Sequence, residues 1–240
     1  MAANVGIQTP TRVLVTGGGS GIGLAVVSEL VARGIQTVAI GRRQKPLLDA
    51  QNCGAETFAY DVREDPNRLL DLVGHVDGLV LNAGVQIREP VEAWSEKAWR
   101  SIFETNVLAS ALLTQAFVSR QSGPASIVGV ASTLAVRPAP NAGAYAASKA
   151  ALIALLANVA LEGAAKQIRA NVVLPGVVNT DMSDPIDGAH ARALSELHPL
   201  GRIGQPGEVG RVIVDILCHD WMTGAQIAID GGLLLGSAKT

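Results

Sequence analysis

Short apolar segments alternate with helix-forming segments along almost the whole chain. The apolar segments are bounded by glycine or polar residues and lie at residues 13–15, 37–40, 57–60, 78–81, 126–130, 170–174 and 226–229. Strands that are apolar on both faces are typical of a parallel sheet covered by helices on both sides. The alternation therefore predicts an α/β fold, a doubly wound parallel sheet in three α/β/α layers.

The segments between these strands carry the periodicity of helices. Helices are predicted at residues 24–33, 98–119 and 209–217, and a further long helix includes Tyr145. The connections at 41–57 and 61–82 are short, which predicts reduced peripheral helices. No linker or repeat interrupts the sequence pattern, so residues 1–240 are predicted to form a single domain.

Composition argues against several classes of protein. Of the 240 residues, 48% are hydrophobic and 17% are charged, and the formal net charge of −2 argues against a nucleic-acid partner. Cys53 and Cys218 lie far apart and form no disulfide framework, which favours a reducing, cytoplasmic location. The histidines lack metal-ligand spacing, and neither a signal peptide nor an apolar run long enough to span a bilayer is evident. We therefore expect no metal and no membrane partner.

A glycine-rich segment, TGGGSGIG at residues 16–23, follows the first predicted strand and precedes the first predicted helix. Glycines let a backbone approach phosphates, and a helix N-terminus supplies free N–H groups and a positive dipole end. Alone, such a segment is often only a tight turn. Between a strand and a helix it predicts Rossmann-type binding of a dinucleotide pyrophosphate. The residues expected to bind it are Gly17, Gly19, Ser20, Gly21, Ile22 and Gly23.

Tyr145 and Lys149 lie four residues apart in an alanine-rich segment that is predicted to be helical. Residues at this spacing share one helix face, so the phenol and the ammonium are expected to lie side by side. The cation should lower the pKa of Tyr145 toward the working pH and so suit the tyrosine to proton transfer. The spacing alone also fits a half-exposed tyrosine beside a solvated lysine.

Taken together and in this order, the glycine segment, Asn82-Ala83-Gly84 and the Tyr145–Lys149 pair resemble the short-chain dehydrogenase/reductase (SDR) family. The resemblance extends from about residue 12 to about residue 234. Other matches follow the family order: Asp61-Val62, Asn106-Val107, Ser132, Pro175-Gly176, Thr180 and Asp230-Gly231-Gly232.

This resemblance implies roles for the matching residues. Tyr145 would be the general acid/base, and Lys149 would bind the nicotinamide ribose and lower the pKa of Tyr145. Ser132 would hydrogen-bond the substrate oxygen, and Asn106 would interrupt a helix and hold a water that links Lys149 to a proton relay. The further cofactor-binding residues implied are Asp61, Val62, Asn82, Ala83, Gly84, Pro175, Gly176, Val178, Thr180 and Met182, together with Tyr145 and Lys149.

The end of the second predicted strand bears on the choice of cofactor. An NAD-binding Rossmann domain commonly places an acidic residue there, against the ribose 2′-hydroxyl. This chain has Gly41-Arg42-Arg43 instead, and guanidinium groups match a phosphate with forked hydrogen bonds. The pattern favours NADP(H), with NAD(H) as the alternative, because Ser20 stands where the family's other NADP signal would be a basic residue.

Two segments are expected to cover the substrate, residues 133–144 and a lid at about 181–199. Their mixed small and apolar residues favour a neutral carbonyl or secondary alcohol, although Arg88 and Arg137 could hold an anionic group if they are not solvated. The expected activity is a carbonyl reductase or alcohol dehydrogenase. The alternatives are an NAD-dependent diol or sugar-alcohol dehydrogenase, a 3-oxoacyl thioester reductase, and a non-catalytic dinucleotide sensor.

The helices predicted to carry Asn106 and Tyr145 are apolar around much of their circumference. Family members are commonly homotetramers built on these helices and on the last strand, so we expect a homotetramer, with a dimer second. The residues that suggest this surface are Leu112, Phe117, Leu152, Leu155, Leu156 and Leu161.

Overall fold

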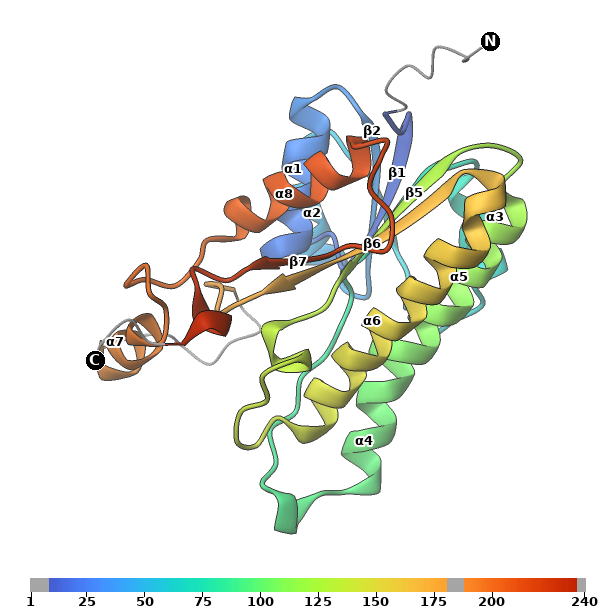
Figure 1. The fold of residues 1–240 in the computed structure, drawn as a ribbon. Coiled ribbons are helices and arrows are strands. Elements are labelled where there is room, and N and C mark those ends of the chain that lie inside the picture. Colours follow the sequence, from blue (N-terminus) through green and yellow to red (C-terminus); the bar gives the residue numbers. More distant parts are fainter. Residues whose placement is uncertain (1–8, 181–187, 237–240) are drawn as a thin grey trace.

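The computed structural model describes residues 9–180 and 188–236. One seven-stranded sheet organises them, with strand order β3-β2-β1-β4-β5-β6-β7, and every neighbouring pair is parallel (Figure 1). Its strands are β1 (Arg12–Thr16), β2 (Gln36–Gly41), β3 (Glu56–Ala59), β4 (Gly78–Leu81), β5 (Ala125–Val130), β6 (Ile168–Pro175) and β7 (Gln226–Ile229). The seven predicted strands and the parallel sheet are confirmed.

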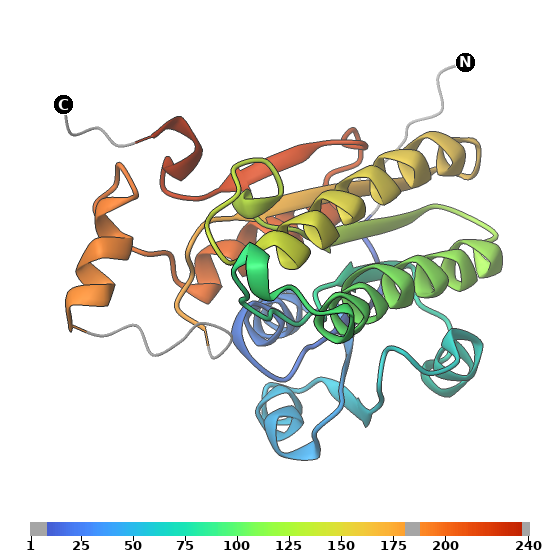
Figure 2. The same ribbon diagram turned by 90° about the horizontal axis from the view of Figure 1, so that it is seen from below.

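Helices cover both faces of the sheet and form the predicted three layers (Figures 1 and 2). Helices α1 and α8 lie on one face with α2 near the β3 edge, whereas α3, α5 and α6 lie on the other. The α-helices are α1 (Gly21–Ala32), α2 (Gln44–Asn52), α3 (Pro66–Val73), α4 (Glu96–Phe103), α5 (Ala109–Arg120), α6 (Gly143–Gly163), α7 (Gly188–Glu196) and α8 (Pro206–Cys218).

Two hydrophobic cores fill the spaces between the sheet and its helix layers. On β1, Val13 and Val15 belong to the core under α1 and α8, and Leu14 belongs to the core under α5 and α6. All three side chains have no solvent exposure. Burial on both faces of each central strand explains why the strands are continuously apolar in the sequence.

The peripheral helices α2 and α3 are nine and eight residues long, in line with the short connections in the sequence. Asp65 caps α3 by accepting a hydrogen bond from the backbone N–H of Asn67, and Pro66 occupies the first turn, where its missing N–H costs nothing. The short length of α2 and α3 does not affect the carboxyl ends of the strands.

The segment predicted as one helix at 98–119 is divided. Helices α4 and α5 are joined by a π-helical turn, Glu104–Leu108, which contains Asn106. A π turn replaces regular i→i−4 bonding and is frequent at functional sites. The interruption implied by the family resemblance is therefore present at Asn106.

Two helical stretches are long and apolar enough to cross a membrane by length and composition, Glu96–Arg120 and Gly143–Lys166. This differs from the expectation that no apolar run reaches that length. Both stretches are about half buried inside the protein, against the sheet and against each other. Core helices of non-membrane proteins pass the same test, so the two stretches are weak support for a membrane span.

Candidate active site

The glycine segment forms a tight loop between β1 and α1, at the carboxyl end of the sheet. Gly17 adopts a φ of 65°, which side chains other than glycine rarely allow. A Cβ at Gly23 would lie 2.1 Å from the carbonyl oxygen of Gly17, so only glycine fits at the start of the helix. The loop thus presents backbone N–H groups at the N-terminus of α1, as a pyrophosphate site requires.

Hydrogen bonds tie this loop to the end of β4. The amide Nδ2 of Asn82 donates to the carbonyl oxygens of Thr16 and Gly17 at 3.0 and 3.1 Å. The hydroxyl of Thr16 accepts from the backbone N–H groups of Asn82 and Ala83, both at 3.0 Å, and donates to the carbonyl of Val80. Asn82 therefore holds the loop in place from the neighbouring strand.

A cavity of about 150 Å³ opens beside the loop. Several residues predicted to bind the cofactor meet here, at the ends of β1, β2, β3 and β4. Its lining also includes residues that the sequence did not single out, among them Pro46, Leu47, Tyr60 and Thr105. The predicted residues that line it are Gly17, Gly19, Ser20, Arg42, Arg43, Asp61, Val62, Ala83 and Gly84.

Asp61 is engaged by a neighbour that sequence reasoning missed. The guanidinium of Arg63 donates to both Asp61 oxygens, the shortest contact being 2.6 Å. This bond holds the pKa of Asp61 below its usual range, with a smaller contribution from the charge of Arg42. Arg42 and Arg43 are exposed at the rim of the same cavity.

The four residues of the implied catalytic set lie in a buried cluster. Asn106, Ser132, Tyr145 and Lys149 are 1%, 8%, 8% and 4% exposed. The Nζ of Lys149 donates to the carbonyl of Val130 at 2.7 Å and lies 5.6 Å from the centre of the Tyr145 ring. The spacing read from the sequence thus brings the two side chains together, and both are buried.

Asn106 connects α6 to the loop after β4. Its Oδ1 accepts from the N–H of Val85 at 2.8 Å, and its Nδ2 donates to the carbonyl of Val85 and to the hydroxyl of Ser148, both at 3.0 Å. Ser148 in turn donates to the backbone carbonyl of Tyr145 at 2.7 Å. Asn106 therefore fixes the first turns of α6, which carry Tyr145.

Ser132 lies just beyond β5, facing the tyrosine. Its hydroxyl accepts from the N–H of Leu134 at 3.1 Å and lies close enough to the Tyr145 phenol to act on its pKa. The Leu134 N–H occupies one acceptor position of the Ser132 hydroxyl. The proton of that hydroxyl is therefore available to the Tyr145 oxygen or to the oxygen of a bound substrate.

The expected fall in the Tyr145 pKa is wrong for this structure. Burial raises the pKa of Tyr145 to about 12, and the nearby Ser132 side chain and the charge of Arg88 lower it only in part. Burial also lowers the pKa of Lys149 to about 8. Desolvation of the phenolate outweighs the neighbouring charges, so the neutral phenol predominates at pH 7.

The segment after β6 reaches back to the glycine loop. The methyl group of Thr180 would lie 3.1 Å from a Cβ placed on Gly21, so Thr180 packs against the start of α1. Val178 is buried and pairs with Gly204, and Gly176 donates to the carbonyl of Ile229. Pro175, the last residue of β6, is also buried. Met182 lies outside the described residues.

His198 is a buried residue of the site region that sequence reasoning missed. Its Nε2 accepts from the backbone N–H of Val177 at 3.3 Å, and its Nδ1 is 2.8 Å from the carbonyl of Leu194 at the end of α7. It therefore joins the second half of the predicted lid to the segment after β6. Residues 181–187 of that lid lie outside the described residues; residues 188–199 form α7 and the turn that follows.

The substrate side carries one unpaired donor. The Nε2 of Gln86 is buried and has no hydrogen-bond partner among the described residues. Arg88 is exposed, and its charge acts on Tyr145. Arg137 donates to the carbonyl of Leu233 and so has a structural partner. Within the described ranges, no three His, Cys, Asp or Glu side chains gather as a metal site.

Comparisons with known proteins agree with this architecture. The sequence model of the family described as short chain dehydrogenase matches residues 11–190. L-xylulose reductase of Mesocricetus auratus is 34% identical over 239 residues, which cover 93% of this chain and 96% of the relative. The 3-oxoacyl-(acyl-carrier-protein) reductase FabG of Chlamydia pneumoniae is 34% identical over 240 residues, which cover 92% of this chain and 96% of the relative.

A solved structure described as "ElxO with NADP Bound" shares the fold, with a TM-score of 0.88 and 23% identity. The match covers 95% of this chain and 100% of that one. The chain belongs to the short-chain dehydrogenase/reductase family. It is an NAD(P)-dependent oxidoreductase that acts on CH–OH and C=O groups.

Proposed function

We propose that the protein is an NADP(H)-dependent carbonyl reductase, reversible as a secondary alcohol dehydrogenase, with Asn106, Ser132, Tyr145 and Lys149 as its site. The observation that carries the proposal is the buried cluster in which Ser132 meets Tyr145 and Lys149 lies beside the phenol ring. A non-catalytic dinucleotide sensor would not require these four side chains together.

The residues fit a nicotinamide dinucleotide. The loop at 16–23 is packed so tightly that a Cβ at Gly23 would meet the carbonyl of Gly17, and the cavity beside the loop ends at Arg42 and Arg43. Gly84 faces Lys149 closely, since a Cβ there would lie 3.4 Å from Nζ. In the proposed complex the loop holds the pyrophosphate, Asp61 and Val62 flank the adenine, and Lys149 and Thr180 hold the nicotinamide half.

Ketone reduction adds a hydride to carbon and a proton to oxygen. The bound cofactor supplies or accepts the hydride. In the proposed mechanism, Tyr145 Oη gives its proton to the substrate oxygen, and Ser132 Oγ donates a hydrogen bond to that oxygen as charge develops. Lys149, with a pKa of about 8, is mostly charged at pH 7 and stabilises the phenolate until solvent returns a proton. A tyrosine kept neutral suits the reductive direction.

The preference for NADP(H) rests on charge at the rim. Arg42 and Arg43 follow β2, line the adenine-side cavity and are exposed toward solvent. The 2′-phosphate of NADP(H) at this rim would gain charge-assisted hydrogen bonds, whereas the ribose 2′-hydroxyl of NAD(H) would not. The similarly folded ElxO is described with NADP bound, which supports the same choice. NAD(H) is the alternative.

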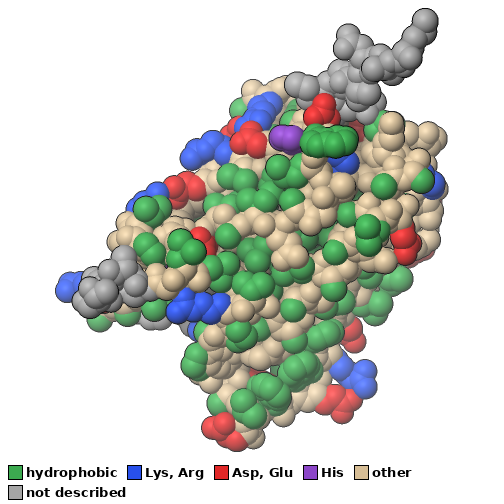
Figure 3. Space-filling model, viewed as in Figure 1, with side chains coloured by type: hydrophobic (Ala, Val, Ile, Leu, Met, Phe, Trp, Pro, Cys, Tyr) green, Lys and Arg blue, Asp and Glu red, His purple; other side chains and the backbone are tan. Residues whose placement is uncertain are grey.

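We also propose that the enzyme is a cytoplasmic homotetramer, with a dimer second. Figure 3 shows the face that carries α6, α8 and β7, where neutral and hydrophobic side chains fill the centre and charged ones lie at the edges. Leu112 and Leu161 are 47% and 79% exposed on α5 and α6 and would be covered by a partner. Phe117, Leu152 and Leu156, which the sequence suggested for the same surface, are instead buried in the protein's own core.

A substrate panel tests the proposed activity. Purified protein is assayed with NADPH and NADH against ketones, short ketoses and a 3-oxoacyl thioester, and oxidation of the reduced nicotinamide is followed by absorbance. The latter two classes are chosen because the relatives are named for them. We expect turnover with NADPH on at least one carbonyl. Cofactor binding without turnover of any of these classes would favour a sensor and contradict the proposal.

A further inference from the structure

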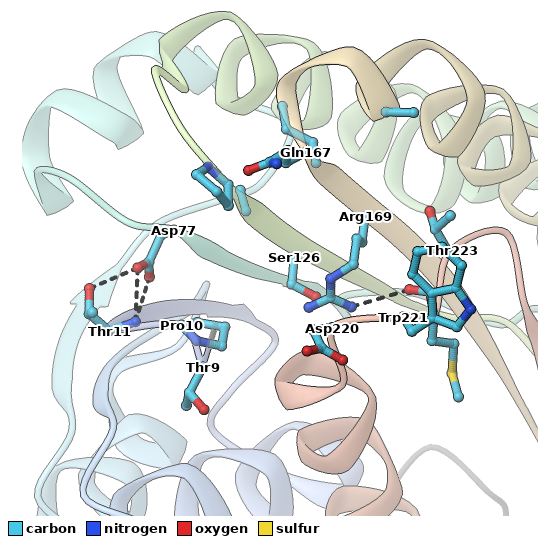
Figure 4. A pocket seen from close by; sticks show the side chains of 15 residues that line it. Thr9, Pro10, Thr11, Asp77, Ser126, Gln167, Arg169, Asp220, Trp221 and Thr223 are labelled. Carbon is cyan, nitrogen blue, oxygen red and sulfur yellow. Dashed lines mark hydrogen bonds between the residues drawn. The ribbon is translucent and has the colours of Figure 1, made fainter. Parts of the chain in front are cut away.

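A cavity of about 530 Å³ lies at the amino ends of the strands, on the edge of the sheet opposite the glycine loop (Figure 4). This volume falls within the range of roughly 300–1,000 Å³ that is typical of small-molecule sites. The segment before β1, the starts of β5 and β6, and the connection between α8 and β7 enclose it. Figure 4 shows Ser126, Arg169 and Asp220 between the Thr9–Thr11 segment and Trp221.

This cavity is separate from the candidate active site. Ser126, which lines it, is the second residue of β5, whereas Ser132 lies just beyond the other end of that strand. At about 3.3 Å per residue, the two serines are about 20 Å apart. A molecule at the amino edge therefore touches none of the residues proposed for hydride transfer.

The hydroxyl of Ser126 lacks a partner. The side chain is 1% exposed, and its Oγ has no hydrogen bond to any described residue. Ser126 is the cross-strand neighbour of Arg169, so the two side chains lie on the same face of the sheet. A buried hydroxyl without a partner is destabilising, and a ligand in the cavity could supply the missing bond.

Two charged side chains of the cavity, Arg169 and Asp77, already have hydrogen-bond partners in the protein. Arg169 donates to the carbonyls of Ile216, Leu217 and Met222 at 3.3, 2.8 and 3.2 Å. Asp220 lies close enough to Arg169 to act on its pKa, although burial of the guanidinium has the larger effect and lowers that pKa. Asp77 accepts from the backbone N–H groups of Thr11 and Arg12. A charged ligand would therefore compete with these existing hydrogen bonds.

Most of the rest of the wall is apolar, although Thr9, Thr11, Gln167 and Thr223 also line it. Trp221 is 93% exposed at the mouth of the cavity, an unusual position for a ring of this size. A ligand that stacked on the ring would remove apolar surface from water. The other apolar residues of the wall are Pro10, Pro124, Ala125, Ala164, Ile168 and Met222.

We propose that this amino-edge cavity binds a neutral, largely apolar small molecule that stacks on Trp221 and forms one hydrogen bond with Ser126. The site is distinct from the proposed activity and does not depend on it. Its ligand is selected by shape, by an aromatic or other flat apolar body and by a single polar group.

The experiment uses N-phenyl-1-naphthylamine, a neutral apolar fluorophore with one N–H group, and the full-length protein saturated with NADP⁺. Ala164→Trp places a large ring in the cavity wall at an exposed position, and the adjacent exposed Ala165→Trp serves as the matched control because Ala165 does not line the cavity. We expect saturable binding by the wild type, at least about tenfold weaker binding by Ala164→Trp, and wild-type binding by Ala165→Trp.

Two further variants test the named contacts. Trp221→Ala and Ser126→Ala should each weaken binding about fivefold, and Ser126→Ala should not lower the melting temperature, because the buried hydroxyl that it removes is unpaired. Absence of saturable binding by the wild type, or equal affinity in the two tryptophan variants, would overturn the site. Unchanged affinity in Ser126→Ala would overturn the assigned hydrogen bond.

Discussion

The proposed catalytic cluster and the proposed cofactor rim, Arg42 and Arg43, lie at the same edge of the sheet but are built differently. The cluster of Asn106, Tyr145 and Lys149 is buried. Asn106 and Lys149 form hydrogen bonds with the backbone, and the carbonyl of Tyr145 accepts one from a neighbouring side chain of α6. Arg42 and Arg43 are exposed on the loop after β2. The difference separates two tasks: the buried cluster is suited to position reacting atoms, and the exposed rim is suited to select among cofactors by charge.

Replacing Tyr145 should have the largest effect. Tyr145→Phe removes the proposed proton donor and should lower kcat by about 10³-fold, within the range for general acid–base groups. Tyr60→Phe is the matched control, since Tyr60 is the other tyrosine of the chain and its hydroxyl donates to the carbonyl of Asp65; because Tyr60 lines the cofactor cavity, both variants are compared at saturating cofactor. Steady-state assays of both variants check this, and equal kcat values would contradict the role of Tyr145.

Asn106 should matter for the fold as well as for activity. Asn106→Ala leaves the partly buried N–H of Val85 and the buried hydroxyl of Ser148 without their present partners, which should cost about 2–3 kcal/mol of unfolding free energy. Asn52→Ala, at an exposed position, should change the unfolding free energy by less than about 0.5 kcal/mol. Urea denaturation of both variants measures the difference. A loss no larger than that of Asn52→Ala would show that the Asn106 contacts are weak.

The burial of Lys149 predicts a pH-dependent stability. Its pKa is about 8 in the folded protein and near 10.5 when unfolded, so between these values the unfolded chain binds a proton that the folded protein does not. The contribution of Lys149 to the unfolding free energy therefore rises with pH. Relative to Lys149→Met, the wild type should gain about 2 kcal/mol between about pH 8 and pH 10.

Urea denaturation at the two pH values measures this gain. The exposed Lys166→Met is the control and should run parallel to the wild type across the same window. A constant difference between wild type and Lys149→Met would contradict the burial argument.

Changes at the rim should be smaller and specific to one cofactor. Arg42→Ala should raise the KM for NADPH about tenfold through the loss of a charge-assisted bond, and it should leave the KM for NADH nearly unchanged. Because Arg42 is exposed, the effect should shrink as ionic strength rises. Arg100→Ala, at an exposed position in α4, is the control. Equal increases with both cofactors would argue against 2′-phosphate recognition.

The strands could be predicted because burial on both faces leaves a continuous apolar run in each. The short helices α2 and α3 are not delimited by the sequence pattern, because nine and eight residues give too few turns for the periodicity to mark their ends. The π turn at Asn106 is invisible to periodicity, because helical spacing continues through it. The break in the helix at Asn106 was predicted only from the family resemblance.

At the site, sequence spacing predicted that Tyr145 and Lys149 are neighbours but gave the wrong direction for the tyrosine pKa. Spacing reports which side chains share a helix face and carries no information on burial, which dominates both pKa values. The contacts of Lys149 with Val130 and of His198 with Val177 join distant segments, so only the fold could provide them.

The most direct test compares single-turnover hydride transfer in Tyr145→Phe and Arg42→Ala at saturating NADPH. If the buried cluster performs the chemistry and the rim only selects the cofactor, Arg42→Ala will return to within about threefold of the wild-type rate, and Tyr145→Phe will remain about 10³-fold slower. Recovery of Tyr145→Phe at saturating cofactor, or an equal and persistent defect in both variants, would contradict the account.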